Sequence, residues 1–204
     1  MLTRYLPFIT AMVFVVVASN YLVQFPVNFT IGAFNLADLL TWGAFTYPIA
    51  FLISDLTNRK FGMGGARIVV MAGFIIAVAL SVVLATPRIA IASGAAFFVA
   101  QMLDVKIFDH LRASQWWQAP LISSVLASVV DTALFFSLAF AAYFVALGPI
   151  DEYAVEGSKL FGVFGIEAPR WVSWALGDLG VKFLVALAML VPYAILRKKF
   201  AQPA

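Results

Sequence analysis

Apolar residues fall in six long blocks along this chain, separated by short segments that contain proline, glycine or charged residues. A helix needs roughly 20 apolar residues to cross the hydrocarbon core of a bilayer, and several of the blocks approach that length. We therefore predict transmembrane helices at about 6–25, 38–57, 66–86, 89–105, 119–147 and 171–196. The expected fold class is an all-α, polytopic six-transmembrane-helix bundle, forming a single transmembrane domain over residues 1–204.

Helix-breaking residues mark the ends of these blocks. Pro26 follows the first block, Pro87 stands between the third and fourth, and Pro120 opens the fifth. The Gly-Met-Gly-Gly segment at 62–65 separates the second block from the third and is typical of a turn. The fifth block is longer than one bilayer crossing requires, so we expect it to tilt or to project beyond the membrane.

The composition supports a membrane protein and excludes several functions. Hydrophobic residues make up 64% of the chain and charged residues only 11%, about half the usual share of a soluble domain. There is no cysteine, which excludes disulfides and thiolate metal sites. The net charge of +3 is small and scattered, so we expect no nucleic-acid partner. No cofactor or metal site is expected.

The basic residues predict the orientation of the chain. Cytoplasmic loops carry an excess of Lys and Arg, and with both termini inside, nine such residues lie on the cytoplasmic side against three outside. The nine are Arg4, Arg59, Lys60, Arg67, Lys106, Arg112, Arg197, Lys198 and Lys199, and the three are Arg88, Lys159 and Arg170. The outer segment at 148–170 is instead rich in acidic residues. We predict that both termini are cytoplasmic.

Three charged residues lie well inside the predicted spans, away from the span ends: Asp131, Asp178 and Lys182. An ionised side chain facing lipid at mid-membrane costs roughly 2.5–3.5 kcal/mol on insertion scales, so these residues must face the bundle interior or a wet cavity. Asp178 and Lys182 are four residues apart and can pair along one helix, and a purely structural pair is one reading of them. Asp131 has no cation within its own helix, so it is protonated, paired with another helix, or used in function.

Other polar residues recur at helical spacing. On the second span one stripe is formed by Asp38, Thr41, Phe45, Pro48, Leu52 and Asp55. Pro48 is expected to kink this span. Asn20 and Gln24 share a face of the first span, and the fourth span offers Gln101 and Asp104. Asp55 and Asp104 are expected near the cytoplasmic interface, where Arg59 or Arg112 would pair with them. Apart from Arg67 at its start, the third span has no charged residue and is expected to be scaffold.

An enzymatic function is not supported. Intramembrane proteolysis by serine needs a base at membrane depth, and His110, the only histidine, lies in a charged segment beside Asp109. The chain contains no HExxH metal motif and no glycine-rich phosphate loop. We therefore predict that the protein is not an enzyme.

Several stretches together resemble the queuosine precursor transporter family of bacterial inner-membrane proteins. They are 19–24 (SNYLVQ), 41–45 (TWGAF), 54–57 (SDLT), 101–105 (QMLDV), Trp116-Trp117, Asp131-Thr132, and Asp178 with Lys182. They run from the first span to the sixth in order, whereas the outer segment at 148–170 carries none of them.

The resemblance implies a transporter in the bacterial inner membrane that imports the 7-cyano or 7-aminomethyl form of 7-deazaguanine. The alternative is a substrate-binding membrane subunit that needs an energising partner. A guanine-like edge offers donors to a carboxylate and an acceptor to Lys, Asn or Gln, and its flat face fits an aromatic slot. The candidate substrate-binding residues are Asn20, Gln24, Trp42, Phe45, Gln101, Asp131, Asp178 and Lys182. The small-molecule substrate and the lipid bilayer are the expected partners, and a homodimer is left open.

Overall fold

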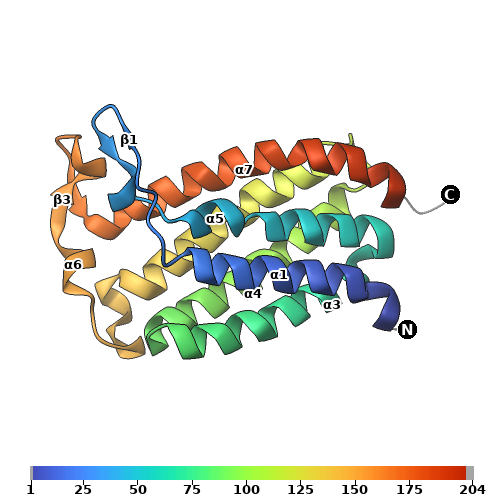
Figure 1. The fold of residues 1–204 in the computed structure, drawn as a ribbon, viewed down its shortest axis with the longest axis horizontal. Helices are drawn as coiled ribbons and strands as arrows, with labels where there is room; N and C mark the ends of the chain where they lie inside the picture. The colour runs from blue at the N-terminus through green and yellow to red at the C-terminus, as the bar shows by residue number, and fades with distance from the viewer. Residues whose placement is uncertain (1, 201–204) are drawn as a thin grey trace.

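The computed structural model describes residues 2–200 as a bundle of long helices with two short hairpins at one end (Figure 1). The helices are α1 (Leu6–Leu22), α2 (Trp42–Thr46), α3 (Ile49–Leu84), α4 (Pro87–Leu111), α5 (Gln118–Phe140), α6 (Glu152–Val155) and α7 (Arg170–Phe200). The hairpins pair β1 (Thr30–Ile31) with β2 (Phe34–Asn35), and β3 (Gly157–Lys159) with β4 (Glu167–Pro169), both antiparallel. The predicted all-α class is confirmed.

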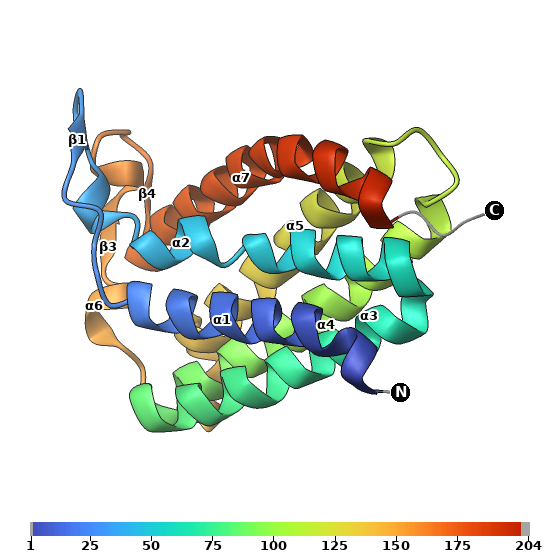
Figure 2. The same ribbon diagram turned by 45° about the vertical axis from the view of Figure 1, so that its right-hand side comes forward.

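Five helical stretches are long and apolar enough to cross a membrane, and the second of them crosses twice. It covers Trp42–Leu84, 43 residues, or about 65 Å at 1.5 Å per residue, which is twice the thickness of a bilayer core. Gly62 interrupts it with φ 75° and ψ 179°, a backbone conformation that glycine adopts easily. The two halves of α3 run in opposite directions (Figures 1 and 2). The result is six membrane-crossing segments, as predicted.

The second segment differs from the prediction at its start. Asp38 ends a short 3-10 helix, η2 (Leu36–Asp38), and Thr41 is extended, because it bridges Pro26 and the Trp42 N–H donates to the carbonyl of Phe25. The predicted stripe was therefore wrong for Asp38 and Thr41, which precede the helix. The kink expected at Pro48 is present, since α2 ends at Thr46 and α3 begins directly after the proline.

The turn predicted at 62–65 is present, because the chain reverses at Gly62, although helical geometry resumes directly after it. Two further boundaries needed correction. The fourth span continues to Leu111 instead of ending near 105. The fifth ends at Phe140 instead of 147, and a 3-10 helix, η3 (Ala142–Leu147), follows it.

Arg88 explains where α5 ends. Its side chain is only 3% exposed, although the sequence placed it in an outer loop. The guanidinium donates to the carbonyls of Leu138 at 3.0 Å and Ala141 at 2.6 Å, and also reaches those of Gly148 and Pro149. The last carbonyls of a helix lack hydrogen-bond donors within the helix, and Arg88, at the start of α4, supplies the donors for α5.

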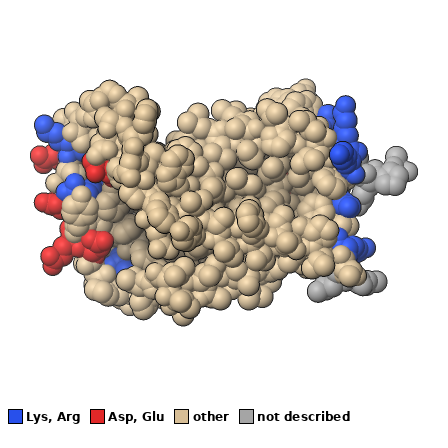
Figure 3. Space-filling model, in the orientation of Figure 1, with Lys and Arg blue, Asp and Glu red and all other residues tan. Residues whose placement is uncertain are grey.

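The surface of the bundle matches a bilayer-spanning protein. Large apolar side chains on the outer faces of the helices are exposed, among them Phe14, Val83 and Leu184. Lys and Arg gather at the end that carries the termini, and acidic residues gather at the hairpin end (Figure 3). The apolar belt between two charged ends is the distribution that a bilayer requires.

Candidate functional site

A cavity of about 570 Å³ lies inside the hairpin end of the bundle. All six membrane-crossing segments contribute to its lining, including the third, which supplies Ser81 and Leu84. The expectation that the third segment is scaffold alone was therefore wrong. The cavity reaches the segment before α2 at Asp38 and the outer helix α6 at Tyr153. Its volume falls in the range of about 300–1,000 Å³ that is usual for small-molecule sites.

An ion triad of Lys182, Asp131 and Asp178 lines the wall of this cavity. The Lys182 Nζ lies 2.6 Å from Asp131 Oδ2 on α5 and 2.5 Å from Asp178 Oδ2 one turn earlier on α7. Thr132 completes the group, because its hydroxyl accepts from Lys182 at 3.0 Å and donates to Asp178 at 2.8 Å. The predicted pairing of Asp178 with Lys182 is confirmed, and Asp131 proves to be partnered from another helix.

The triad is unevenly exposed to the cavity. The Lys182 and Asp131 side chains are 5% and 7% exposed, whereas that of Asp178 is 16% exposed. With all three groups ionised, two carboxylates face one ammonium and the triad carries one net negative charge. The buried ammonium of Lys182 is neutralised because it faces both carboxylates. The carboxylate oxygens of the triad can also accept hydrogen bonds from a ligand.

Aromatic rings form the other part of the lining. Phe135, Phe136 and Phe140 follow Asp131 along α5, and the Phe140 ring lies 5.5 Å from that of Trp174 on α7. The Trp174 indole also donates to the Asp38 carbonyl at 2.8 Å, which ties α7 to the segment before α2. The rings and the triad both come from α5 and α7, so a planar ligand would find stacking surfaces one helical turn away from the triad.

The predicted binding residues divide into two groups. Five line the cavity: Asn20, Gln24, Asp131, Asp178 and Lys182. Three do not, namely Trp42, Phe45 and Gln101. Trp42 is 48% exposed and its ring packs against Phe45, while Gln101 is 1% exposed and lies among other buried side chains.

Sequence reasoning missed several lining residues, most clearly Tyr47 and Trp174. It also missed the hydrogen bonds of Thr132 within the triad. Trp174 stands near the start of the predicted sixth span, where an indole is typical of the membrane interface, so its position in the sequence does not indicate a binding role. Thr132 was quoted beside Asp131, yet a lone threonine in an apolar span gives no sign that it bonds a neighbouring helix. For Tyr47, the one signal in the sequence was its position directly before Pro48, the residue that was expected to kink the span.

A second buried polar group lies between α3, α4 and α5. Asp55 and Asp104 are 2% and 0% exposed, and neither forms an ion pair within the described residues 2–200. The expected pairing with Arg59 or Arg112 was wrong, because α4 continues to Leu111 and carries Arg112 away from Asp104. Arg59 instead donates to the backbone carbonyl of Arg112 at 2.7 Å.

Comparisons with known proteins agree with a transporter. A family model described as "Putative vitamin uptake transporter" matches residues 41–86 and 79–196. The chain is 39% identical over 155 residues to the "Probable queuosine precursor transporter" of Haemophilus influenzae, covering 63% of this chain and 66% of that protein. It is 34% identical over 204 residues to the "Queuosine precursor transporter" of Escherichia coli, covering 89% of this chain and 81% of that protein. No solved structure matches the chain.

Proposed function

This chain belongs to the vitamin uptake transporter family, and from that premise we propose that it imports queuosine precursors across the bacterial inner membrane with both termini in the cytoplasm. The names of the two relatives supply the substrate class. The Lys- and Arg-rich end of the bundle supports the orientation, because cytoplasmic segments of membrane proteins carry an excess of these residues. The cavity then lies in the outer half of the membrane, on the side from which an imported substrate arrives.

The observation that carries the proposal is the cavity that combines the ion triad with an aromatic wall. A 7-deazaguanine presents a ring N–H and an amine on one edge, which the carboxylates of Asp131 and Asp178 can accept. Its carbonyl oxygen can accept from the amides of Asn20 and Gln24, since the three N–H groups of Lys182 already face Asp131, Asp178 and Thr132. The flat bicyclic ring fits against Phe136 or Trp174.

Binding is tested with the purified protein in detergent. A ligand that binds only the folded state raises its melting temperature, so 7-cyano-7-deazaguanine should produce a concentration-dependent rise. Riboflavin and biotin are the comparison ligands, because the family as a whole is described as taking up vitamins. A larger rise with either vitamin, and none with the deazaguanine, would assign this chain a different substrate.

Transport is tested with labelled deazaguanine and proteoliposomes that contain this protein alone. Uptake above that of empty liposomes, suppressed by excess unlabelled compound, is the expected result. Binding in detergent without uptake in liposomes would instead identify a substrate-binding subunit that needs an energising partner.

A further inference from the structure

Two carboxylates are buried side by side below the substrate cavity without a compensating cation. Asp55 on α3 and Asp104 on α4 interact electrostatically, and the Ser123 hydroxyl of α5 approaches both. The Ser54 hydroxyl donates to Asp104 Oδ2 at 2.9 Å. Hydroxyls from two helices therefore face the pair, yet no Lys, Arg or His within residues 2–200 forms an ion pair with either carboxylate.

The surroundings of the pair contain more acceptors than donors. Buried atoms without a hydrogen-bond partner include Oδ1 of Asp55, of Asn58 and of Asp104, and both amide atoms of Gln101. Gln101 is 1% exposed and Asn58 is fully buried. Each lies one helical turn from a carboxylate and on the same face of its helix, three residues before Asp104 and three after Asp55. Native proteins leave few buried polar atoms unpaired, so this concentration indicates a missing donor or cation.

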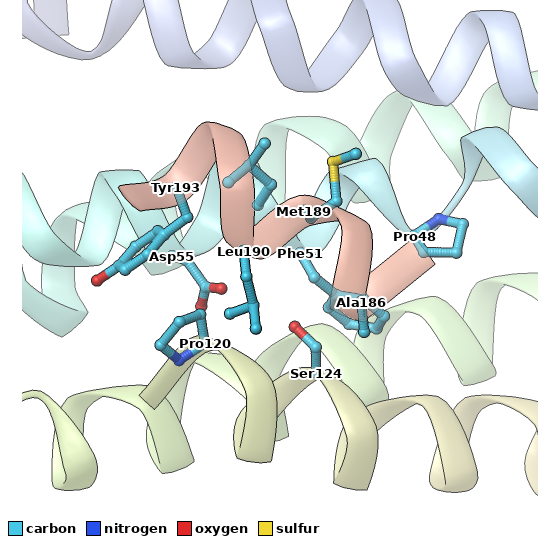
Figure 4. Close-up of a pocket in the computed structure, with 10 residues that line it drawn as sticks. Pro48, Phe51, Asp55, Pro120, Ser124, Ala186, Met189, Leu190 and Tyr193 are labelled. Carbon is cyan, nitrogen blue, oxygen red and sulfur yellow. The ribbon is translucent and has the colours of Figure 1, made fainter. Parts of the chain in front are cut away.

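The structure also provides space and a connection to the substrate site. A cavity of about 10 Å³ adjoins the pair on the side of Asp55, with Ser124 and Tyr193 also in its lining, and it has about the room of one water-sized species (Figure 4). Ser128, whose buried hydroxyl is also unpaired, lies one turn from Ser124 and one turn from Asp131. Ser124 and Asp131 are seven residues apart on α5, which corresponds to about 10 Å along the helix.

We propose that Asp55 and Asp104 together bind one monovalent cation, either a proton or Na⁺, and that its binding and release drive substrate import. Two adjacent buried carboxylates are costly as two free charges, and one bound cation relieves both the repulsion and the unpaired oxygens. Ionisable groups placed inside a membrane bundle commonly serve ion pathways. The proposal rests on the proposed transport function, which it extends by naming the coupling site.

Groups around the pair define what else could respond to pH. Tyr193 of α7 lines the same small cavity, and its electrostatic surroundings include Arg59, Arg112 and Arg197. Ser123 and Ser124 on α5 do not ionise in this range. Variants of the pair must therefore be compared with wild type under identical conditions, so that these other groups contribute equally.

The first experiment measures cation binding without substrate. The melting temperature of the purified protein is followed against Na⁺ at constant ionic strength with choline as the replacement, and separately against pH. Wild type should be stabilised by Na⁺ or by lowering the pH, depending on which cation binds. Asp104→Asn and Asp55→Asn should lose that response. Asp109→Asn, the same substitution at a half-buried site five residues along α4, should keep it.

The second experiment measures coupling in proteoliposomes with labelled 7-cyano-7-deazaguanine. A tenfold inward gradient of the coupled cation supports up to about tenfold accumulation when one ion moves per substrate. We expect wild type and Asp109→Asn to accumulate substrate under one of the two gradients, a pH gradient if a proton is coupled or a Na⁺ gradient if Na⁺ is coupled. Asp104→Asn should still bind substrate in detergent but should only equilibrate it. Gradient-driven accumulation by Asp104→Asn equal to wild type would overturn the proposal.

Gln101→Leu separates a coupling role from a structural one. Replacing an unpaired buried amide by an apolar side chain of similar size should leave stability unchanged or raise it. The proposal predicts that this variant nevertheless needs a several-fold higher cation concentration for half-maximal uptake. An unchanged requirement would count against a ligand role for Gln101, even where the aspartate variants fail to fold. If wild type accumulates as much substrate without a cation gradient as with one, the coupling is refuted and the transport function is left intact. If wild type binds no deazaguanine, the transport function itself is refuted.

Discussion

The ion triad determines what single substitutions at the substrate cavity should do. Lys182 neutralises two carboxylates from two helices, and Thr132 links the same groups by hydrogen bonds. Removing one carboxylate leaves one ammonium facing one carboxylate, which is a balanced pair. Removing the ammonium leaves two facing carboxylates. The two kinds of change therefore separate function from stability.

Asp131→Asn should fold and insert normally but fail to import precursor. Asp178 still neutralises Lys182 in this variant, whereas the ligand loses a charged acceptor and meets an amide donor in its place. The measurement is the queuosine content of tRNA in bacteria that cannot make the precursor and receive it at low concentration. Glu152→Gln in the exposed outer helix α6 is the control and should support wild-type content. Normal modification in the Asp131→Asn strain would show that Asp131 only holds α5 to α7.

Lys182→Met should destabilise the protein more than full neutralisation of the triad. Leaving buried charge without its partner costs about 3–5 kcal/mol, whereas replacing a whole buried ionic group by neutral residues is often close to neutral. The comparison variant is Asp131→Asn with Asp178→Asn and Lys182→Met, which removes all three charges. Melting temperatures in detergent should fall in the order wild type, triple variant, single variant. Equal melting temperatures for the two variants would contradict a charge-balancing role for Lys182.

Residue chemistry was predictable from the sequence where both partners share a helix. Asp178 and Lys182 are four residues apart, so their pairing follows from helical geometry. The bond between Lys182 and Asp131 spans 51 residues and depends on how α5 packs against α7, which no local pattern reveals. The same limitation explains the wrong prediction for Asp55 and Asp104. They were expected to pair with nearby arginines, but Asp55 on α3 instead faces Asp104 on α4.

At the scale of elements, hydrophobic length predicted the crossing segments well and their ends poorly. The bilayer imposes a length on each apolar block, so all six segments were found. Their ends depend on contacts that lie outside the block. The start of α2 is set by the backbone pairing of Trp42 with Phe25, and the end of α5 by a guanidinium from α4.

Arg88→Met should destabilise the hairpin end of the bundle. The buried guanidinium bonds carbonyls at the end of α5 and at the start of the outer segment, and a hydrogen bond to a charged group contributes about 1.5–3 kcal/mol. We expect a loss of at least about 2 kcal/mol, seen as a lower melting temperature. Arg88→Lys should recover part of the loss, because one ammonium cannot reach the four carbonyls with the forked geometry of arginine. Arg67→Met at an exposed site is the control, and an equal effect there would exclude a specific role for Arg88.

At the scale of the whole molecule, charge divides the bundle into two ends. The termini and most of the Lys and Arg side chains lie at one end, and the hairpins and the acidic side chains visible on the surface lie at the other (Figures 1 and 3). The break at Gly62 divides one long helical stretch into two crossings, which brings the total to six. Because six is an even number, both termini lie on the same side of the membrane. In the proposed orientation the positive end faces the cytoplasm, so the substrate cavity would face outward and the carboxylates of Asp55 and Asp104 would lie on the inward side of it.

The natural chain contains no cysteine, which allows this orientation to be tested one position at a time. Single cysteines at Ala33 and Glu167 lie in the two hairpins, and those at Ser114 and Lys199 lie at the opposite end, all at exposed positions. A maleimide that cannot cross the inner membrane should label the hairpin pair in intact cells with a permeable outer membrane. The other pair should be labelled only after the inner membrane is disrupted. Labelling of Ser114→Cys in intact cells would reverse the orientation, and with it the direction from which substrate reaches the triad.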